Sequence, residues 1–194
     1  MTEDNQIIVF DDFLSRNSTL NLKKKLLGLS FPWYYAPSST YKNDSEWSDD
    51  PAFMFHIFRN ENLVNSDHYY LILEKFNKLF ELVGREASLV RANLVLKKFM
   101  TGEVNWHKDR EDEHFVALFY VTDSSACTLV KMRENNELRN GKIESKSGRL
   151  ALIPGEIYHS HQFPVDEDRV VINFIFEGKF PNKLRKIGND SDRS

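Results

Sequence analysis

Residues 148–178 read "GRLALIPGEIYHSHQFPVDEDRVVINFIFEG" and contain two short apolar runs. Both runs are rich in Leu, Ile, Val and Phe, and Gly, Pro and Asp residues separate them, which is typical of β-strands joined by turns. Three earlier stretches repeat the pattern, namely "SLVRANLVLKKF" (88–99), "FVALFYVT" (115–122) and "CTLVKM" (127–132). Several short strands close together predict a sandwich or barrel in the second half of the chain.

The first half of the chain predicts helices instead. Residues 7–15, "IIVFDDFLS", resemble a short strand, and residues 15–29 then supply capping residues followed by leucines at helical spacing. Residues 53–59 predict another strand. A second helix is predicted between a cap at Ser66 or Asp67 and a stop at Gly84, with one apolar face formed by Tyr69, Leu73, Phe76, Phe80 and Val83. Helices first and strands second favour an α+β fold over alternating βαβ units.

Residues 31–51 interrupt this pattern with prolines and a dense polar run between aromatic residues. They predict a long surface loop and a candidate lid over a site. The aromatic residues Trp33, Tyr34, Tyr35 and Tyr41 are expected to pack this loop against the barrel, with lining of a substrate groove as the alternative. Residues 1–178 are expected to form a single domain, and residues 179–194 a polar, flexible C-terminal tail.

Composition and charge exclude several classes of protein. The net charge of −3 with interspersed acids and bases lacks the basic footprint of a nucleic-acid-binding protein. The polar start of the chain and the absence of a run of about eighteen apolar residues speak against a membrane role, so a cytoplasmic location is expected. Because Cys127 is the only cysteine, a metal would have to be held by histidine and carboxylate groups. The oligomeric state stays open.

Residues 105–109, "NWHKD", offer such groups. If they end a strand, His107 and Asp109 lie two apart and point to the same side of the sheet. His159, in a later predicted strand, could complete a set of two imidazoles and one carboxylate. That set suits Fe(II) and leaves positions for a chelating substrate and O2. His161 lies on the same face as His159 and is the alternative third ligand. It is also possible for the His-x-Asp pattern to occur by chance, with His159 a surface or packed histidine that binds no metal.

Arg169 adds a fourth group to this constellation. If residues 164–168 form a turn between two antiparallel strands, Arg169 stands about three positions from His159, on the order of 10 Å. Its guanidinium could then form a two-pronged ion pair with the far carboxylate of a small dicarboxylic acid whose other end chelates the metal.

The stretches "RANLVLKKFMTGEVNWHKD", "FVALFYVT" and "GRLALIPGEIYHSHQFPVDEDRVVINFIF" resemble the Fe(II)/2-oxoglutarate-dependent dioxygenases, in the branch similar to prolyl 4-hydroxylases and small phage oxygenases. The resemblance covers residues 91–176. It implies a double-stranded β-helix, or jelly roll, flanked by the N-terminal helices. It also implies that His107, Asp109 and His159 bind Fe(II), and that Arg169, helped by the Tyr120 hydroxyl, binds the C5 carboxylate of 2-oxoglutarate.

The resemblance further implies hydroxylation of a C–H bond, with O2 consumed, succinate and CO2 released, and ascorbate as a possible support. A peptidyl proline or another side chain of a protein or peptide, as in the prolyl hydroxylases, is the expected substrate, with a small metabolite or free amino acid second. A metal-binding jelly roll of the cupin kind, or a non-catalytic binding module, is the alternative class.

The remaining candidates carry weaker signals. His114 follows an acidic turn and is expected to be a solvated loop residue, and His56 a core or surface histidine. Asn93, Thr128 and Asn173 lie in strand contexts where they support the site or make cross-strand hydrogen bonds.

Overall fold

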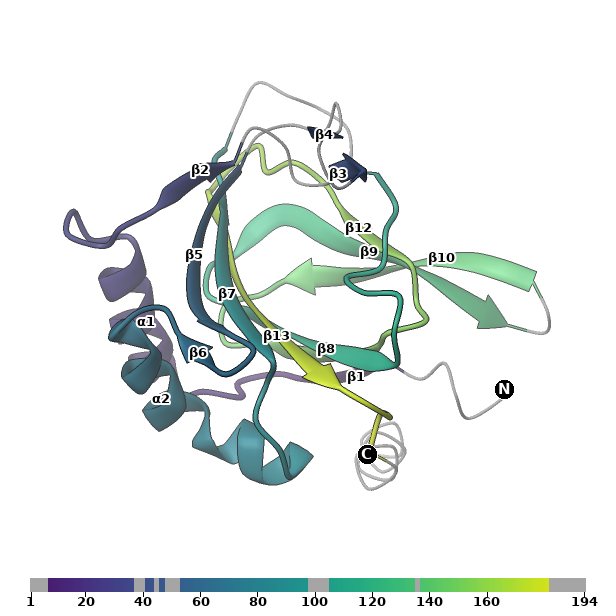
Figure 1. Ribbon diagram of the computed structural model, residues 1–194. Helices are drawn as coiled ribbons and strands as arrows, with labels where there is room; N and C mark the ends of the chain where they lie inside the picture. Colours follow the sequence, from purple (N-terminus) through teal and green to yellow (C-terminus); the bar gives the residue numbers. More distant parts are fainter. Residues whose placement is uncertain are drawn as a thin grey trace.

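The computed structural model describes residues 7–36, 41–43, 46–47, 53–97, 105–134 and 137–181. The fold is α+β: two helices lie on one side of antiparallel β-sheets that form a jelly roll, as predicted (Figure 1). The largest sheet has eight strands. Seven of them follow one another in the order β1 (Ile8–Phe10), β11 (Leu150–Pro154), β8 (His114–Tyr120), β13 (Arg169–Glu177), β7 (Leu89–Val95), β5 (Phe53–Asn60) and β2 (Tyr34–Ala36), and β6 (Leu63–Val64) pairs with β5.

A smaller sheet faces one side of the large sheet. It consists of β10 (Glu137–Ser145), β9 (Ser124–Glu134) and β12 (His159–His161), in that order. Side chains from β8, β9, β10, β11 and β13 form a buried apolar cluster between the two sheets; its members include Val116, Leu118, Val130, Ile143, Ile153 and Val171. A separate two-stranded ribbon joins β3 (Tyr41–Asn43) to β4 (Glu46–Trp47).

Helices α1 (Arg16–Leu26) and α2 (His68–Val83) cover the other face of the large sheet. Ser15 caps α1, because its hydroxyl accepts a hydrogen bond from the Ser18 N–H at 3.2 Å. Gly84 ends α2 in the left-handed conformation (φ 79°), as predicted. The fully buried face of α2 is slightly rotated from the predicted one, since Ile72 and Leu79 are buried more deeply than Leu73 and Phe80; it consists of Tyr69, Ile72, Phe76, Leu79 and Val83. No helix in the described ranges is long and apolar enough to cross a bilayer.

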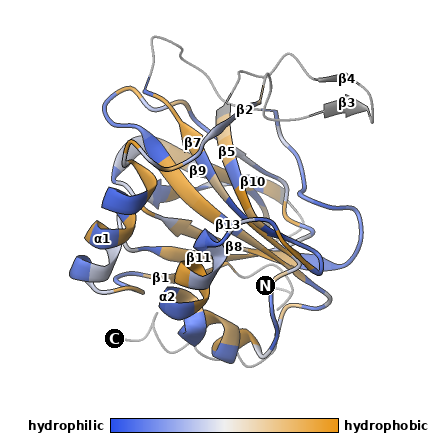
Figure 2. Ribbon diagram, turned by 60° about the vertical axis from the view of Figure 1, so that its left-hand side comes forward, coloured by the Kyte–Doolittle hydropathy of each residue, from blue (hydrophilic) through white to orange (hydrophobic). Residues whose placement is uncertain are grey.

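The alternation of side chains explains why the central strands read as unbroken apolar runs. All seven residues of β8 are buried. Phe115, Ala117 and Phe119 contribute to the core under the helices, whereas Val116, Leu118 and Tyr120 point into the space between the sheets. A strand covered on both faces needs apolar residues at every position, and the hydropathy of the large sheet shows this (Figure 2).

The structure differs from the prediction in two segments of the chain. Residues 31–51 are not entirely loop, because β2 pairs with β5 and the ribbon β3–β4 also falls there; residues 37–40, 44–45 and 48–51 lie outside the described residues, so the lid stays a prediction. Strand β10 was not predicted at all. Its sequence "ELRNGKIES" is too polar to signal a strand, and pairing with β9 is what forms it.

The predicted hairpin between His159 and Arg169 is also wrong. Strand β12 pairs with β9 in the small sheet, while β13 lies between β7 and β8 in the large sheet. Residues 164–168 therefore carry the chain from one sheet to the other. The local turn signal was read correctly, but the partner of each strand is set by long-range packing.

The C-terminal tail falls mostly outside the described residues, which end at Pro181. Within the predicted tail, Phe180 is 7% exposed and its ring lies 5.4 Å from that of Phe115.

Candidate active site

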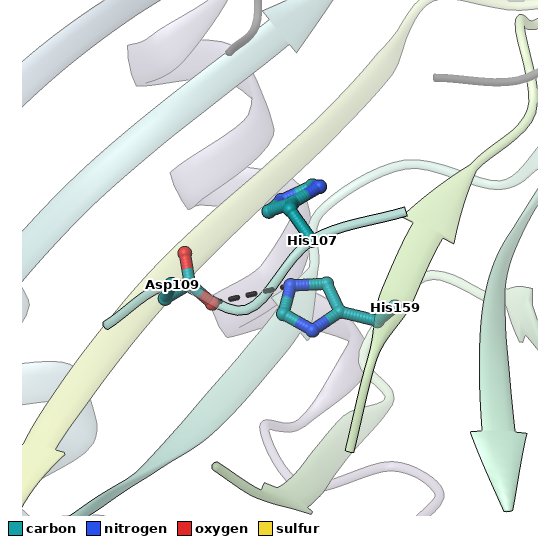
Figure 3. A group of neighbouring side chains, drawn as sticks. All are labelled: His107, Asp109 and His159. Carbon is teal, nitrogen blue, oxygen red and sulfur yellow. Dashed lines mark ion pairs between the residues drawn. The ribbon is translucent and has the colours of Figure 1, made fainter. Parts of the chain in front are cut away.

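Three potential metal ligands meet at one edge of the small sheet. His107 was predicted to lie at the end of a strand. It instead forms an isolated antiparallel bridge with His159. Each backbone N–H donates to the other residue's carbonyl, at 3.0 and 2.9 Å. The bridge brings the ligand atoms of His107, Asp109 and His159 within 4.8 Å of one another (Figure 3). The predicted triad is thus assembled, although by a different backbone arrangement.

The two imidazoles are oriented by backbone carbonyls. His107 Nδ1 lies 2.8 Å from the Asn105 carbonyl oxygen, and His159 Nδ1 lies 3.4 Å from that of Ile157. Because a carbonyl only accepts hydrogen bonds, these contacts place the proton on Nδ1 and leave the Nε2 lone pair available to a metal.

Asp109 has the features of a metal ligand. Its side chain is 8% exposed, and Oδ1 accepts a long hydrogen bond from Asn173 Nδ2 at 3.4 Å. Oδ2 is buried and accepts no well-formed hydrogen bond from the described residues, although His159 Nε2 lies 3.2 Å away. Two lone pairs that face each other at this distance need a shared proton or a metal ion between them.

The pKa shifts of Asp109 and His159 also indicate a binding site for a positive charge. Burial alone would raise the pKa of Asp109, but positive charge on His159, on His107 and on Arg91 outweighs it and holds the pKa below its usual range. Burial would lower the pKa of His159, and the Asp109 carboxylate outweighs it, so this pKa is raised. The site therefore favours a positive charge beside Asp109, which a metal ion supplies.

Arg169 lies in the same cleft, as predicted, although it reaches it from the opposite sheet. It is 5% exposed, and its Nη2 donates to Thr128 Oγ1 at 2.8 Å while its Nε donates to Ser145 Oγ at 3.2 Å. In the described part of the chain no carboxylate lies within ion-pair distance of it. Burial lowers the pKa of Arg169. A buried cation held only by hydroxyl groups is suited to an incoming anion.

Tyr120 lies next to this cation but outside the cleft wall. Its ring centroid is 5.7 Å from the Arg169 guanidinium carbon, and its hydroxyl donates to Thr128 Oγ1 at 2.8 Å. Thr128, not Tyr120, lines the cleft. Thr128 thus accepts hydrogen bonds from both residues, while the Tyr120 ring also lies directly beside the Arg169 guanidinium.

The cleft between the sheets contains more polar groups than the prediction named. Besides the triad, Arg169 and Thr128, it is lined by Arg91, Asn93, Val95, Leu118, Ser160, His161, Val171 and Asn173. Arg91 was missed. The signal was present in "LVRANLV", where Val90, Ala92 and Leu94 face the helices and the alternate positions carry Arg91 and Asn93.

His161, His114 and His56 are not members of the group whose ligand atoms lie within 4.8 Å of one another. His161 lines the cleft, and burial together with the nearby Arg169 lowers its pKa well below the usual value. His114 was predicted to be a solvated loop residue. It instead begins β8 and is 5% exposed, because pairing of this strand buries it. His56 is buried against Phe31, and its Nδ1 lies 2.7 Å from the Pro32 carbonyl, which confirms a core histidine.

The aromatic residues of the predicted loop divide into two groups. Trp33 packs against the core and donates from Nε1 to the Leu26 carbonyl at 2.9 Å. Tyr34 is 56% exposed, but its ring stacks on that of His56 with the centroids 6.0 Å apart, whereas Tyr35 is 70% exposed and the expected packing is wrong for it. The side chain of Tyr41 lies outside the described residues.

No protein-family model matches this chain, and no curated protein sequence matches it either. Solved structures share its fold. An oxidoreductase of the 2OG-Fe(II) oxygenase family from Burkholderia pseudomallei superposes with a TM-score of 0.65 at 11% identity, over 91% of this chain and 88% of that one. A prolyl hydroxylase from Trichoplax adhaerens, in complex with a hypoxia inducible factor peptide fragment, gives a TM-score of 0.65 at 12% identity over 94% and 87%.

A third similar structure is that of the epimerase SnoN, in complex with Fe3+, alpha ketoglutarate and nogalamycin RO. Its TM-score is 0.60 at 10% identity, over 90% of this chain and 80% of that one. At these identities the likeness is one of fold. The chain has the jelly-roll fold of the 2-oxoglutarate- and Fe(II)-dependent oxygenases.

Proposed function

We propose that this protein is an Fe(II)- and 2-oxoglutarate-dependent dioxygenase that hydroxylates a C–H bond. One observation carries the proposal: a group of two imidazoles and a carboxylate, of which His159 is buried and the other two are half-buried, has its ligand atoms within 4.8 Å of one another and shares its cleft with a buried arginine. The triad suits Fe(II) with open coordination positions, and the arginine suits the far carboxylate of a chelating 2-oxo acid.

Each residue has a distinct role in this proposal. His107 and His159 would bind iron through Nε2, because their Nδ1 atoms face backbone carbonyls. Asp109 would bind through Oδ2, the oxygen that accepts no well-formed hydrogen bond from the described residues, while Asn173 steadies Oδ1. The chemistry supplied by bound iron and 2-oxoglutarate is oxidative, with O2 consumed, succinate and CO2 released, and oxygen inserted into a C–H bond.

Arg169 would neutralise the C5 carboxylate of 2-oxoglutarate. Thr128 and Ser145 hold its guanidinium in place, so the side chain is already oriented before the anion arrives. The surrounding apolar residues, among them Leu118 and Val171, exclude water and strengthen this pairing.

For the substrate we propose a side chain of a protein or peptide, with a small molecule as the alternative. The similar structures include a prolyl hydroxylase bound to a peptide fragment and an epimerase bound to nogalamycin RO, so both kinds of ligand occur on this fold.

The test is formation of succinate without added substrate. Purified protein with Fe(II), ascorbate and 2-oxoglutarate should make succinate, and anaerobic Fe(II) plus 2-oxoglutarate should give a visible charge-transfer band. Asp109→Ala should abolish both, because the triad loses its only carboxylate. Glu74→Ala, which removes an exposed carboxylate from α2, is the matched control and should behave as wild type.

A wild-type protein that binds metal but neither binds 2-oxoglutarate nor makes succinate would contradict the proposal. That result would instead support a metal-binding jelly roll of the cupin kind.

A further inference from the structure

Three polar side chains form a patch beside the metal ligands, and none of them binds the metal or 2-oxoglutarate in the proposed function, where Asn173 contributes only its Nδ2 contact with Asp109. Arg91 and Asn93 stand two apart on β7, and Asn173 on β13 is the register partner of Arg91. All three line the cleft. Directly opposed residues of antiparallel strands have Cβ atoms about 4.5–5.5 Å apart, so the three form one surface, called here the amide patch. Asn173 ties this patch to Asp109 through the 3.4 Å contact.

The amide patch contains two buried acceptors without donors. The Oδ1 atoms of Asn93 and Asn173 are buried and accept no hydrogen bond from the described residues. Asn173 is itself only 4% exposed. Its orientation is fixed, because turning the amide round would place Oδ1 against the Asp109 carboxylate. Buried acceptors are normally satisfied, so a ligand that enters here should bring N–H or O–H donors.

The charge of Arg91 limits which ligand group fits. A carboxylate would suit Arg91 but has no donor and would meet two amide oxygens. An ammonium group would satisfy those oxygens but would be repelled by Arg91 and the nearby Arg169. An apolar ring such as that of proline would leave both amide oxygens without a donor. A primary carboxamide has two N–H donors and one carbonyl acceptor, and so matches both the oxygens and the guanidinium.

We infer that the substrate presents a primary carboxamide to the amide patch, as the side chain of asparagine or glutamine does. This inference rests on the proposed function and narrows its substrate class. The carboxamide donates to Asn93 Oδ1 and Asn173 Oδ1 and accepts from Arg91, which holds the adjacent methylene next to the ligands of the metal. A peptidyl proline is thereby disfavoured, since its ring nitrogen has no hydrogen to donate.

The test uses the full chain with Fe(II), ascorbate and 2-oxoglutarate, and six pools of short random peptides. Each pool has one fixed central residue, namely Asn, Gln, Asp, Glu, Leu or Pro. Every peptide carries an N-acetyl and an N-methylamide cap and lacks Asn and Gln elsewhere, so that a primary carboxamide occurs only at the centre. Succinate formation above the substrate-free level and a mass gain of one oxygen are measured.

The Asn or Gln pool should stimulate succinate formation at least about 10-fold more than the Asp, Glu, Leu and Pro pools, because a site built to hydrogen-bond a group rejects analogues that lack it. The added oxygen should lie on the central residue. Equal or greater stimulation by the Pro, Asp or Glu pool would overturn the inference, and so would stimulation by no pool while substrate-free succinate formation persists. Absence of both that succinate and the charge-transfer band would overturn the proposed function, and the inference with it.

A variant separates recognition from folding. Asn93→Leu keeps the size of the side chain but removes the amide, so the preference for the carboxamide pool over the Leu pool should fall at least about 10-fold through a higher KM. The anaerobic charge-transfer band reports whether the metal and 2-oxoglutarate are still bound. Asn77→Leu, on the exposed surface of α2, is the matched control. An Asn93→Leu protein that forms the band and keeps the full preference would overturn the inference.

Discussion

Arg169 shows how a single residue gains its role from its surroundings. Its guanidinium is buried and donates to two hydroxyl groups, from β9 and β10, that carry no charge. Burial of a cation without an anion is unfavourable, and such an arrangement is retained where an anion binds.

Arg169→Ala should therefore weaken 2-oxoglutarate binding much more than iron binding. Loss of a buried, two-pronged carboxylate pair should raise the dissociation constant of 2-oxoglutarate on the order of 100-fold, while that of Fe(II) changes by less than about threefold. Titration of the charge-transfer band measures the first, and metal content after dialysis the second.

Arg16→Ala is the control, since Arg16 is exposed at the start of α1. Equal loss of iron and 2-oxoglutarate in Arg169→Ala would show that the arginine supports the metal site instead.

Much of the site was predictable at this scale. Residue type and spacing predicted His107, Asp109 and Arg169 together with either His159 or His161, and the resemblance to the dioxygenases favoured His159. Tyr120 was expected to reach the anion, but its hydroxyl is directed to Thr128. Which of two neighbouring hydroxyl groups faces a cleft depends on side-chain packing and is not encoded in spacing.

At the scale of elements, the segment 164–168 connects the sheet that carries His159 to the sheet that carries Arg169. Asp166 organises it: one carboxylate oxygen accepts from the Ser125 N–H at 2.9 Å, from the Ser125 hydroxyl at 2.7 Å and from the Glu167 N–H at 2.7 Å. These hydrogen bonds, those to Ser125 first, lower the pKa of Asp166 from 3.8 to about 2.

The stability contributed by Asp166 should depend on pH. Because the folded pKa lies below the unfolded one, the contribution is fully present above about pH 4 and is lost as the pH falls through about 2. Asp166→Asn should lower the free energy of unfolding by about 1 kcal/mol or less near neutral pH, since solvent screens this exposed carboxylate. Urea denaturation of both proteins between pH 7 and pH 2 measures it. A difference that stays constant across this range would contradict the assignment.

Helix α2 owes its position to aromatic packing on the large sheet. Phe76 is fully buried, and its ring lies 4.9 Å from those of Phe119 and Phe174. Phe76→Ala should lower the free energy of unfolding by about 3–5 kcal/mol, because it leaves a cavity under the helix.

Tyr70→Ala, on the same helix but 63% exposed, should change it by less than about 0.5 kcal/mol. Chemical denaturation of the two variants makes the comparison. Similar losses in both would show that helix propensity, not burial, governs this element.

At the scale of the whole molecule, the cleft lies between two sheets that separate on unfolding. The triad draws His159 from the small sheet, and Arg169 comes from the large sheet, so ligands bound to both stabilise the folded state only.

Anaerobic Fe(II) with 2-oxoglutarate at about 100 times their dissociation constants should add about 2.7 kcal/mol per ligand. For a chain of this size, each kcal/mol raises the Tm by about 2–4 °C. Thermal unfolding followed by circular dichroism measures the shift, a chelator should reverse it, and Asp109→Ala should not show it. An equal rise in Asp109→Ala would indicate binding elsewhere.

The sequence by itself predicted the type of most long elements, with strand β10 as the exception, and it predicted the triad with His161 left as the alternative to His159. Apolar periodicity predicts burial, and a strand such as β8 or a helix such as α2 follows from local pattern alone. The tertiary structure decided which strands pair: β12 joins β9, β13 joins β7 and β8, and the polar strand β10 forms only against β9. Pairing depends on contacts between residues far apart in the chain, so the bridge between His107 and His159, and the placement of Arg91 beside Asn173, come from the folded molecule as a whole.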